Sequence, residues 1–266
     1  MPKRFSEAVG AFYDAAAEQI RDPGLLFLNY GFDGPDDPDP DWISRDDLPY
    51  RLHLNLIRHL VRGVDLKGKS VLEVSSGRGG NCRYLSSYSA AERIVGLDRC
   101  LGNVRLSRDA VGSERVSFLN GDAQAMSFPD ETFDVVVNIE AAHCYGDWPL
   151  FLSEVYRLLV PGGTFCLTDL WGLDLQGIDW VRREVELAES GFEVLLEEDI
   201  SGGVLGALRQ RDEGVYRFFS PTAGSPDGDL RGKVLDVADQ LGMFLALGEC
   251  SYRLWRFRKP ANRMGK

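Results

Sequence analysis

The spacing of apolar positions divides the chain into a helical first part and a longer part in which strands and helices alternate. Residues 5–21 carry apolar side chains three and four positions apart, which predicts an amphipathic helix. A second helix is predicted over 48–62. The segment 33–42 between them is rich in proline and aspartate and is expected to form an exposed loop. We therefore expect an N-terminal helical cap with an acidic loop over residues 1–62.

Beyond residue 63, short apolar runs alternate with amphipathic stretches. The run Val135-Val136-Val137 is typical of a central strand that is buried on both faces. Strands are predicted at 69–74, 93–98, 115–119, 133–139 and 163–169, with helices near 80–90, 101–111 and 148–159. Strands that alternate with helices predict right-handed βαβ units and a parallel sheet covered on both sides.

The last part of the chain breaks this alternation. Its pattern predicts a helix near 175–190, a strand near 192–199, a helical stretch from about 203 to 247 and a final strand near 251–258. No internal repeat is present. We therefore expect one elaborated domain in this chain of 266 residues rather than two separate ones.

Composition and charge narrow the class of partner. The hydrophobic fraction is 44% and the charged fraction is 27%, as in an ordinary globular protein, and no apolar run is long enough for membrane insertion. A formal net charge of −11 argues against nucleic acid, which generally requires a basic face. The N-terminal residues lack the apolar core of a secretory signal. Five scattered cysteines without a C-x-x-C pair predict reduced thiols, a cytoplasmic location and no structural zinc.

A glycine-rich turn follows the first strand of the alternating region. Residues 71–80 read VLEVSSGRGG, an apolar strand that enters a turn and then a helical pattern. Gly77 and Gly79 lack a Cβ atom, so their backbone N–H groups can approach a ligand directly. Ser75 would be strained if the turn required a positive φ there, although its small side chain still allows close approach. Alone, the turn is equally typical of a plain connection between strand and helix.

Acidic residues end the next two strands. Asp98 lies 21 residues after Gly77, a separation at which a carboxylate can accept hydrogen bonds from both ribose hydroxyls of an adenosine. Asp122 could accept a hydrogen bond from an adenine amino group, while Ala123 offers a backbone N–H. Because ligands of open parallel sheets bind beyond the carboxyl ends of the strands, these residues and Gly77 predict one nucleoside site.

Two cofactor classes fit a nucleoside site. A nicotinamide dinucleotide site has three glycines in G-x-G-x-x-G spacing, but this chain has Ser75 where the first glycine would lie. It also has Glu73 inside the strand, which a dinucleotide site does not require. A carboxylate there suits a cationic ligand that carries an amino acid group. S-adenosylmethionine is both, so these residues favour it.

The same residues carry a family resemblance. The pattern Glu73-x-Ser75-x-Gly77-x-Gly79 resembles motif I of class I S-adenosylmethionine-dependent methyltransferases, E/D-x-G-x-G-x-G. Two downstream matches concern the nucleoside: Asp98 matches the ribose-binding acid of the family, and residues 121–123 match its adenine-contacting G-D-A segment. Two others concern the sheet: residues 128–134 match the F-x-D-x-x-F-D approach to strand four, and residues 158–164 match the L-x-P-G-G turn before strand five. The implied cofactor is S-adenosyl-L-methionine, with S-adenosyl-L-homocysteine as the product.

The resemblance implies both a fold and a cofactor site. The fold is an α/β, Rossmann-like sheet of seven strands, mostly parallel with the last strand antiparallel. Its S-adenosylmethionine-binding domain would cover 63–266, with substrate-pocket helices within about 171–247. The implied cofactor-binding residues are Glu73, Ser75, Gly77, Gly79, Asp98, Arg99, Asp122, Ala123 and Asn138.

A closer similarity concerns three further segments. Residues 52–56, 138–145 and 251–255 resemble the phthiotriol/phenolphthiotriol dimycocerosate-type methyltransferases and related actinobacterial natural-product enzymes. Residues 171–247, which in this family help to shape the acceptor pocket, match poorly. This similarity implies natural-product biosynthesis, including antibiotics, and a largely apolar small-molecule acceptor.

The residues after the fourth strand are the candidates for catalysis. His143 follows that strand, and a neutral imidazole can take a proton from an acceptor hydroxyl near pH 7. Glu140 could orient His143 or hold a polar part of the substrate. The alternative for His143 is a hydrogen bond to the start of its own helix. We expect the acceptor to contact Tyr13, Tyr30, Tyr145 and Trp171, and we expect no metal, because Asp147 and Asp169 alone are too few carboxylates.

The sequence therefore predicts a methyltransferase that acts on a small, largely apolar secondary metabolite, with oxygen as the expected target atom. Carbon or nitrogen methylation remains an alternative, because one fold and one cofactor site serve all three. A further alternative is a protein that binds the cofactor without methyl transfer, as a scaffold or as a catalyst of a rearrangement. A homo-oligomer also stays open.

Overall fold

The computed structural model describes residues 3–20, 25–34, 42–173, 178–210 and 228–261. Its helices are α1 (Lys3–Gln19), α2 (Arg51–Leu60), α3 (Gly80–Tyr88), α4 (Leu101–Ala110), α5 (Trp148–Leu158), α6 (Trp180–Glu189), α7 (Ser201–Gln210) and α9 (Gly228–Leu247). Its strands are β1 (Ser70–Val74), β2 (Arg93–Asp98), β3 (Val116–Asn120), β4 (Phe133–Ile139), β5 (Leu159–Trp171), β6 (Glu193–Asp199) and β7 (Ser251–Arg258). Short 3₁₀ turns cover Leu48–Tyr50 and Ala142–Cys144.

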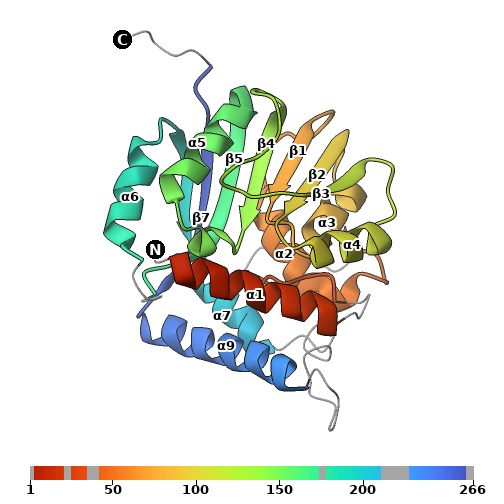
Figure 1. Ribbon diagram of the computed structural model, residues 1–266, viewed down its shortest axis with the longest axis vertical. Coiled ribbons are helices and arrows are strands. Elements are labelled where there is room, and N and C mark those ends of the chain that lie inside the picture. Colours follow the sequence, from red (N-terminus) through yellow and green to blue (C-terminus); the bar gives the residue numbers. More distant parts are fainter. Residues whose placement is uncertain (1–2, 21–24, 35–41, 174–177, 211–227, 262–266) are drawn as a thin grey trace.

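Within the described residues, seven strands form one sheet in the order β3-β2-β1-β4-β5-β7-β6 (Figure 1). Strands β1 to β5 pair in parallel, while β7 runs antiparallel to both of its neighbours, β5 and β6. The predicted Rossmann-like sheet with an antiparallel last strand is confirmed. The strand order reverses at β1, which has β2 on one side and β4 on the other. That reversal is where ligands of open α/β sheets bind.

Helices cover both faces of the sheet because successive strand residues point to opposite sides. Val71 of β1 belongs to a core that also contains residues of α2, α3 and α4, whereas Leu72 belongs to a second core with residues of α5 and α6. Both residues are fully buried. The continuous apolar run of a parallel strand thus supplies two cores at once, as the sequence pattern of β4 predicted.

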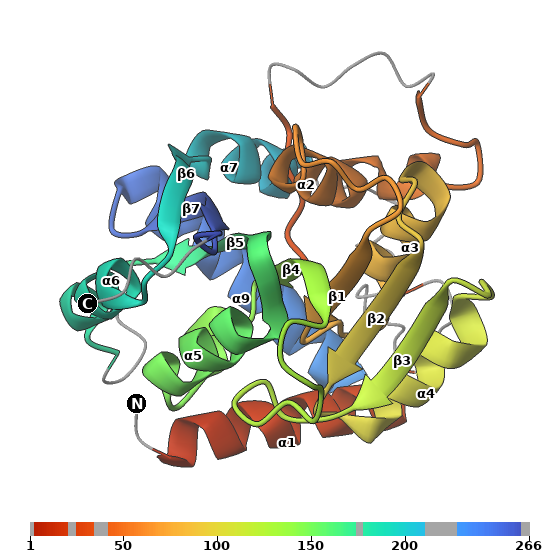
Figure 2. The same cartoon turned by 90° about the horizontal axis from the view of Figure 1, so that it is seen from above.

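Helix α1 crosses the carboxyl ends of the parallel strands, with α7 and α9 beneath it (Figures 1 and 2). It contacts α4 and the 3₁₀ turn Ala142–Cys144. Helix α2, which we assigned to the N-terminal cap, contacts α3, β5 and β7 on one face of the sheet. None of the helices in the described part of the chain is long and apolar enough to cross a membrane.

Several boundaries differ from the sequence-based expectation. Strand β5 begins at Leu159 rather than 163, and the expected turn Pro161-Gly162-Gly163 lies inside it as an irregularity. Pairing with β4 shifts between Phe133 and Val135, and Gly162 has φ +81°. The expected helical stretch 203–247 contains α7 and α9. The residues between them, and most of the acidic loop, lie outside the described residues.

Candidate functional site

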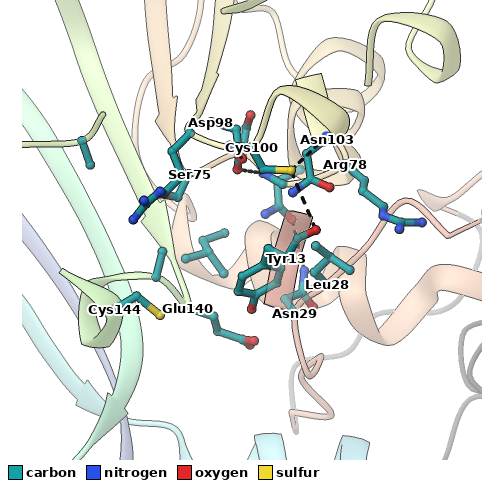
Figure 3. Close-up of a pocket in the computed structure, with 18 of the residues that line it drawn as sticks. Tyr13, Leu28, Asn29, Ser75, Arg78, Asp98, Cys100, Asn103, Glu140 and Cys144 are labelled. Carbon is teal, nitrogen blue, oxygen red and sulfur yellow. Dashed lines mark hydrogen bonds between the residues drawn. The ribbon is translucent and has the colours of Figure 1, made fainter. Parts of the chain in front are cut away.

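A cavity lies beyond the carboxyl ends of β1 to β4, where the sheet topology predicts a ligand. It contains about 1020 Å³ of non-protein space, including its open mouth. Its walls come from the segments that follow β1, β2, β3 and β4, from residues 26–29, and from Tyr13 of α1. Figure 3 shows Tyr13 between the strand end that carries Asp98 and the one that carries Glu140. We call this space the strand-end cavity.

The turn after β1 requires an unusual backbone. Ser75, Gly77 and Gly79 have φ values of +59°, +53° and +84°. A Cβ atom on Gly79 would lie 2.7 Å from the ring of Phe118, so this position needs glycine for space as well as for conformation. Ser75 does adopt the positive φ at which we expected strain, and its hydroxyl shares a 2.8 Å hydrogen bond with the hydroxyl of Tyr145.

Asp98 ends β2 at the wall of the strand-end cavity. Its carboxylate accepts hydrogen bonds of 2.8 Å from the backbone N–H groups of Gly77 and Cys100. Gly77 N–H is therefore engaged with Asp98 and is not a free donor, contrary to the sequence-based expectation. Burial raises the pKa of Asp98 to about 6, and the backbone hydrogen bonds limit this rise. At neutral pH the carboxylate is ionised and can accept hydrogen bonds from a diol.

The end of β3 supplies the next wall. Asp122 is exposed, whereas Ala123 is buried, and both line the cavity together with Arg99. Backbone N–H of Gln124 donates to Asp122 Oδ1 at 2.9 Å. The structure thus brings together six of the nine predicted cofactor residues: Ser75, Gly77, Asp98, Arg99, Asp122 and Ala123.

The other three, Glu73, Gly79 and Asn138, do not line the cavity. Glu73 is 1% exposed, and it accepts hydrogen bonds from Asn81 Nδ2 at 2.8 Å and from Cys82 Sγ at 2.9 Å. Burial raises the pKa of Glu73 to about 7. Asn81, which does line the cavity, therefore stands between Glu73 and a ligand. Sequence reasoning missed Asn81, whose signal is its place in the first turn of the helix after Gly79.

Asn138 acts on the cavity through a neighbour. Its Nδ2 donates to the carbonyl of Val74 at 3.0 Å and to the hydroxyl of Tyr145 at 2.7 Å. Tyr145 lines the strand-end cavity and also meets Ser75. Asn138 is thus a positioning residue that fixes Tyr145 against the glycine turn.

His143 forms a tight pair with a buried carboxylate. Its Nδ1 lies 2.7 Å from Asp169 Oδ1, and its backbone N–H donates to Asp169 Oδ2 at 3.0 Å. Burial by itself would lower the pKa of His143, but the charge of Asp169 outweighs burial and raises that pKa well above its usual value. This shift favours the protonated ring, whereas the sequence-based expectation was a neutral imidazole. His143 does not line the cavity, but the adjacent Cys144 does and interacts with it.

Glu140 lies at the cavity wall just after β4, with φ +52°. Its Oε1 accepts hydrogen bonds from the backbone N–H of Tyr30 at 2.8 Å and from the hydroxyl of Tyr252. Burial raises the pKa of Glu140 to about 8. Glu140 thereby ties the segment around Tyr30 to the end of β4 and presents a mostly neutral carboxyl group to the cavity.

A second cavity of about 870 Å³ of non-protein space adjoins the first, and we call it the α1–α9 cavity. Tyr13 and Asn29 line both cavities, whereas Tyr30 lines only the second. Trp171 lines neither. Its ring lies 5.0 Å from Trp255 and its Nε1 donates to Glu184, so the structure does not support Trp171 as an acceptor contact. Sequence reasoning did not single out Asn29, although an amide that follows the apolar residues 25–28 was a signal.

Among the described residues, no group of three or more His, Cys, Asp or Glu side chains is arranged to hold a metal ion. The polar groups that line the strand-end cavity are instead a buried carboxylate, side-chain amides and backbone groups. This set fits a nucleoside with an attached amino acid.

Comparison with known proteins supports the same assignment. A methyltransferase domain model matches residues 72–167. The chain is 32% identical to a phthiotriol/phenolphthiotriol dimycocerosates methyltransferase of Mycobacterium leprae, over 93% of this chain and 90% of that protein. It is 36% identical to a fatty-acid O-methyltransferase of Mycolicibacterium smegmatis, over 94% of this chain and 89% of that one. The crystal structure of the [4+2]-cyclase SpnF superposes with a TM-score of 0.74 at 20% identity, covering 97% of each chain, and shows the shared fold.

Proposed function

This chain belongs to the family of S-adenosylmethionine-dependent methyltransferases that includes the phthiotriol/phenolphthiotriol dimycocerosates methyltransferases, and on that premise we propose that it methylates an oxygen atom of a small, largely apolar metabolite. S-adenosylmethionine is its cofactor. The proposal concerns the acceptor, the atom that is methylated and the residues that take part.

The strand-end cavity fits the cofactor. Asp98 presents an ionised, buried carboxylate to ribose hydroxyls, and Asp122 with Ala123 lies where an adenine ring would be read. Asn81 and Ser75 line the same cavity and would contact the amino acid end of the cofactor. When bound, S-adenosylmethionine supplies a methyl group on a positively charged sulfur.

The pair of His143 and Asp169 is the observation that carries the assignment to oxygen. An acceptor hydroxyl loses a proton during methyl transfer, and a histidine held by a buried carboxylate is a strong base for that proton. In the neutral ring, Asp169 holds the proton on Nδ1 and leaves Nε2 to accept one. The raised pKa of His143 means that this neutral form becomes more abundant as pH rises. Cys144 interacts with His143 and lines the cavity, whereas His143 does not, so the acceptor would reach the ring past this thiol.

The α1–α9 cavity supports an apolar acceptor. Apolar side chains from α1, from the segment after it and from α9 make up most of its wall, namely Phe12, Ala16, Ile20, Leu25, Phe27, Leu28, Val237 and Ala238. Because it shares Tyr13 and Asn29 with the strand-end cavity, a long acceptor could occupy one cavity and present its oxygen in the other.

Methyl-transfer assays test this proposal. The full chain is incubated with S-adenosylmethionine and hexadecanoic acid, undecan-6-ol or dodecylamine, and release of S-adenosylhomocysteine is followed with mass spectrometry of the products. We expect an ester or an ether. Methylation of the amine alone would overturn the assignment to oxygen.

The alternatives predict other results from the same assay. Transfer to carbon would give a product that survives ester hydrolysis and retains its free polar group. A scaffold or rearrangement catalyst would bind S-adenosylhomocysteine in calorimetry but release none from S-adenosylmethionine. We also propose a cytoplasmic location, because the cysteines at positions 82, 100, 144, 166 and 250 are all free.

A further inference from the structure

His53 occupies an unusual position in the wall of the α1–α9 cavity. It lies in the middle of α2, is 3% exposed and stacks on Phe27, with ring centroids 5.8 Å apart. Most of the remaining wall is apolar. Buried polar atoms are generally hydrogen-bonded, so each ring nitrogen of a histidine in such surroundings is expected to have a hydrogen-bond partner.

The tautomer of His53 follows from its hydrogen bond. Nδ1 lies 2.7 Å from the backbone carbonyl oxygen of Asn29, which can only accept, so Nδ1 carries the proton. Burial lowers the pKa of His53 to about 4 despite this hydrogen bond, so the ring is neutral at pH 7. Nε2 is then an acceptor with a free lone pair.

Nε2 has no hydrogen-bond partner in the part of the chain that the structure describes. Nε2 is also not among the fully buried polar atoms that lack a hydrogen-bond partner in that part of the chain. Because His53 lines the α1–α9 cavity, we infer that Nε2 faces this cavity. An acceptor that faces an apolar cavity costs free energy unless a ligand supplies a donor.

A polar network holds His53 in place. Asn29 Nδ2 donates to Asn81 Oδ1 at 3.2 Å, and Asn81 Nδ2 donates to Glu73 at 2.8 Å. His53 is thus linked through Asn29 to the residues that flank the glycine turn. Its ring cannot rotate to turn Nε2 away without breaking the bond to Asn29.

Resting on the proposed function, we propose that His53 is a specificity-determining residue whose Nε2 accepts a hydrogen bond from a hydroxyl on the apolar part of the acceptor, distinct from the oxygen that is methylated. His53 lines only the α1–α9 cavity, whereas Glu140 and Cys144 line only the strand-end cavity. One hydroxyl cannot serve both places. The acceptor class is therefore an aliphatic chain with at least two polar groups.

Nitrogen NMR of the imidazoles tests the contact directly, because the chain has three histidines. The full-length protein with ¹⁵N-labelled histidine is saturated with S-adenosylhomocysteine and titrated with undecan-6-ol or with undecane. We expect the Nε2 resonance of His53 to move upfield with the alcohol and to stay in place with the alkane. The methyl signals of Ala16 and Ala238 report whether each probe enters the cavity.

Two variants separate recognition from folding. His53→Asn keeps a donor toward Asn29 but has no acceptor at the Nε2 position, while His53→Gln can restore an acceptor there. We expect His53→Asn to bind undecan-6-ol roughly tenfold more weakly, a loss of about 1.4 kcal/mol, with undecane binding unchanged. His53→Gln should recover part of that loss. His59→Asn, outside both cavities, is the matched control.

The outcomes separate this inference from the proposed function. If both probes enter the cavity and the Nε2 resonance of His53 never moves, or if His53→Asn weakens both probes equally, the role of His53 is wrong while the methyltransferase assay can still succeed. If neither probe enters, the apolar acceptor cavity itself is wrong and both ideas fall.

Discussion

His143 meets one carboxylate through both its ring and its backbone, which fixes where its free nitrogen points. If His143 takes the acceptor proton, His143→Ala should lower kcat by roughly 10²-fold. Since the charge of Asp169 raises the pKa of His143, the neutral, basic form of the ring becomes more abundant as pH rises, and the wild-type rate should rise with it. Steady-state kinetics at several pH values checks both expectations, with His59→Ala as the control histidine. An unchanged kcat in His143→Ala would remove it from the mechanism.

Glu140 makes a prediction about stability. Its pKa in the folded protein is raised to about 8, so between about pH 4.5 and 8 the unfolded chain has lost this proton and the folded chain retains it. Its contribution to the free energy of unfolding must therefore fall as pH rises, with a slope no steeper than about 1.4 kcal/mol per pH unit.

Urea unfolding of wild type and Glu140→Gln from pH 5 to 8 isolates this contribution. Glutamine still accepts from Tyr30 and Tyr252 but does not titrate, so the wild type should lose stability relative to the variant as pH rises. A difference that is constant with pH would contradict the raised pKa.

Single residues also show where sequence reasoning stops. The spacing of Glu73, Gly77 and Asp98 located the turn and the strand-end acid. It could not tell that Glu73 is sealed behind Asn81, because whether a strand residue faces a ligand or a helix depends on how the helix packs. Trp171 was misplaced for the same reason: the aromatic cluster that buries it comes from three other elements.

At the level of elements, α6 holds the turn that carries His143 from outside the cavity. Arg183 is 5% exposed, and its guanidinium donates to the carbonyls of Ala142 and Tyr145, each at 2.8 Å. It also lies 5.2 Å from the ring centroid of Trp148. The turn that carries His143 is therefore pinned by a side chain far along the chain.

Removing that anchor should weaken both the fold and catalysis. Arg183→Leu removes two hydrogen bonds from a charged donor and leaves the Tyr145 carbonyl without this donor, while Ala142 keeps only the 3.2 Å bond from Tyr145 N–H. We therefore expect the free energy of unfolding to fall by about 2–4 kcal/mol and kcat to fall with it. Thermal unfolding and kinetics measure these effects. Arg182→Leu is the neighbouring control, since the side chain of Arg182 is 72% exposed and its pair with Glu186 contributes little. Equal losses in both variants would argue against the anchor.

Most elements could be predicted from periodicity, but their ends could not. The L-x-P-G-G segment was expected to be a turn because proline and glycine usually interrupt strands. In the structure β5 runs through it, since Leu159 still pairs with Phe133 before the register shifts. The start of β5 is therefore set by its pairing with β4. The local sequence around residue 159 does not show which strand will lie beside it.

For the whole molecule, ligand binding should appear as stability. A ligand present at 100 times its Kd adds about 2.7 kcal/mol to the free energy of unfolding, which corresponds to a rise in Tm of about 5–10 °C for a chain of this size. We expect S-adenosylhomocysteine to produce this rise in scanning calorimetry. Asp98→Asn should reduce it strongly, because one of its two acceptor oxygens becomes a donor. A full shift in Asp98→Asn would exclude Asp98 from the cofactor site.

The global topology followed from the sequence because alternation of strands and helices restricts the arrangement of a parallel sheet. The acceptor side did not follow. The α1–α9 cavity draws residues from α1, from the segment 25–30, from α2 and from α9, and nothing in local periodicity brings these segments together. The strand-end cavity is formed at the carboxyl ends of neighbouring strands, whereas the α1–α9 cavity is formed by packing between segments that lie far apart in the sequence.

Helix α1 has a consequence for the catalytic cycle. Its Tyr13 lines both cavities, and Figure 3 shows this side chain at the wall of a single cavity. If α1 must move to admit one reactant, the same movement would also open the other cavity. We would then expect the entry of the two reactants to be coupled, and turnover to depend on the rate of that movement as well as on the chemical step.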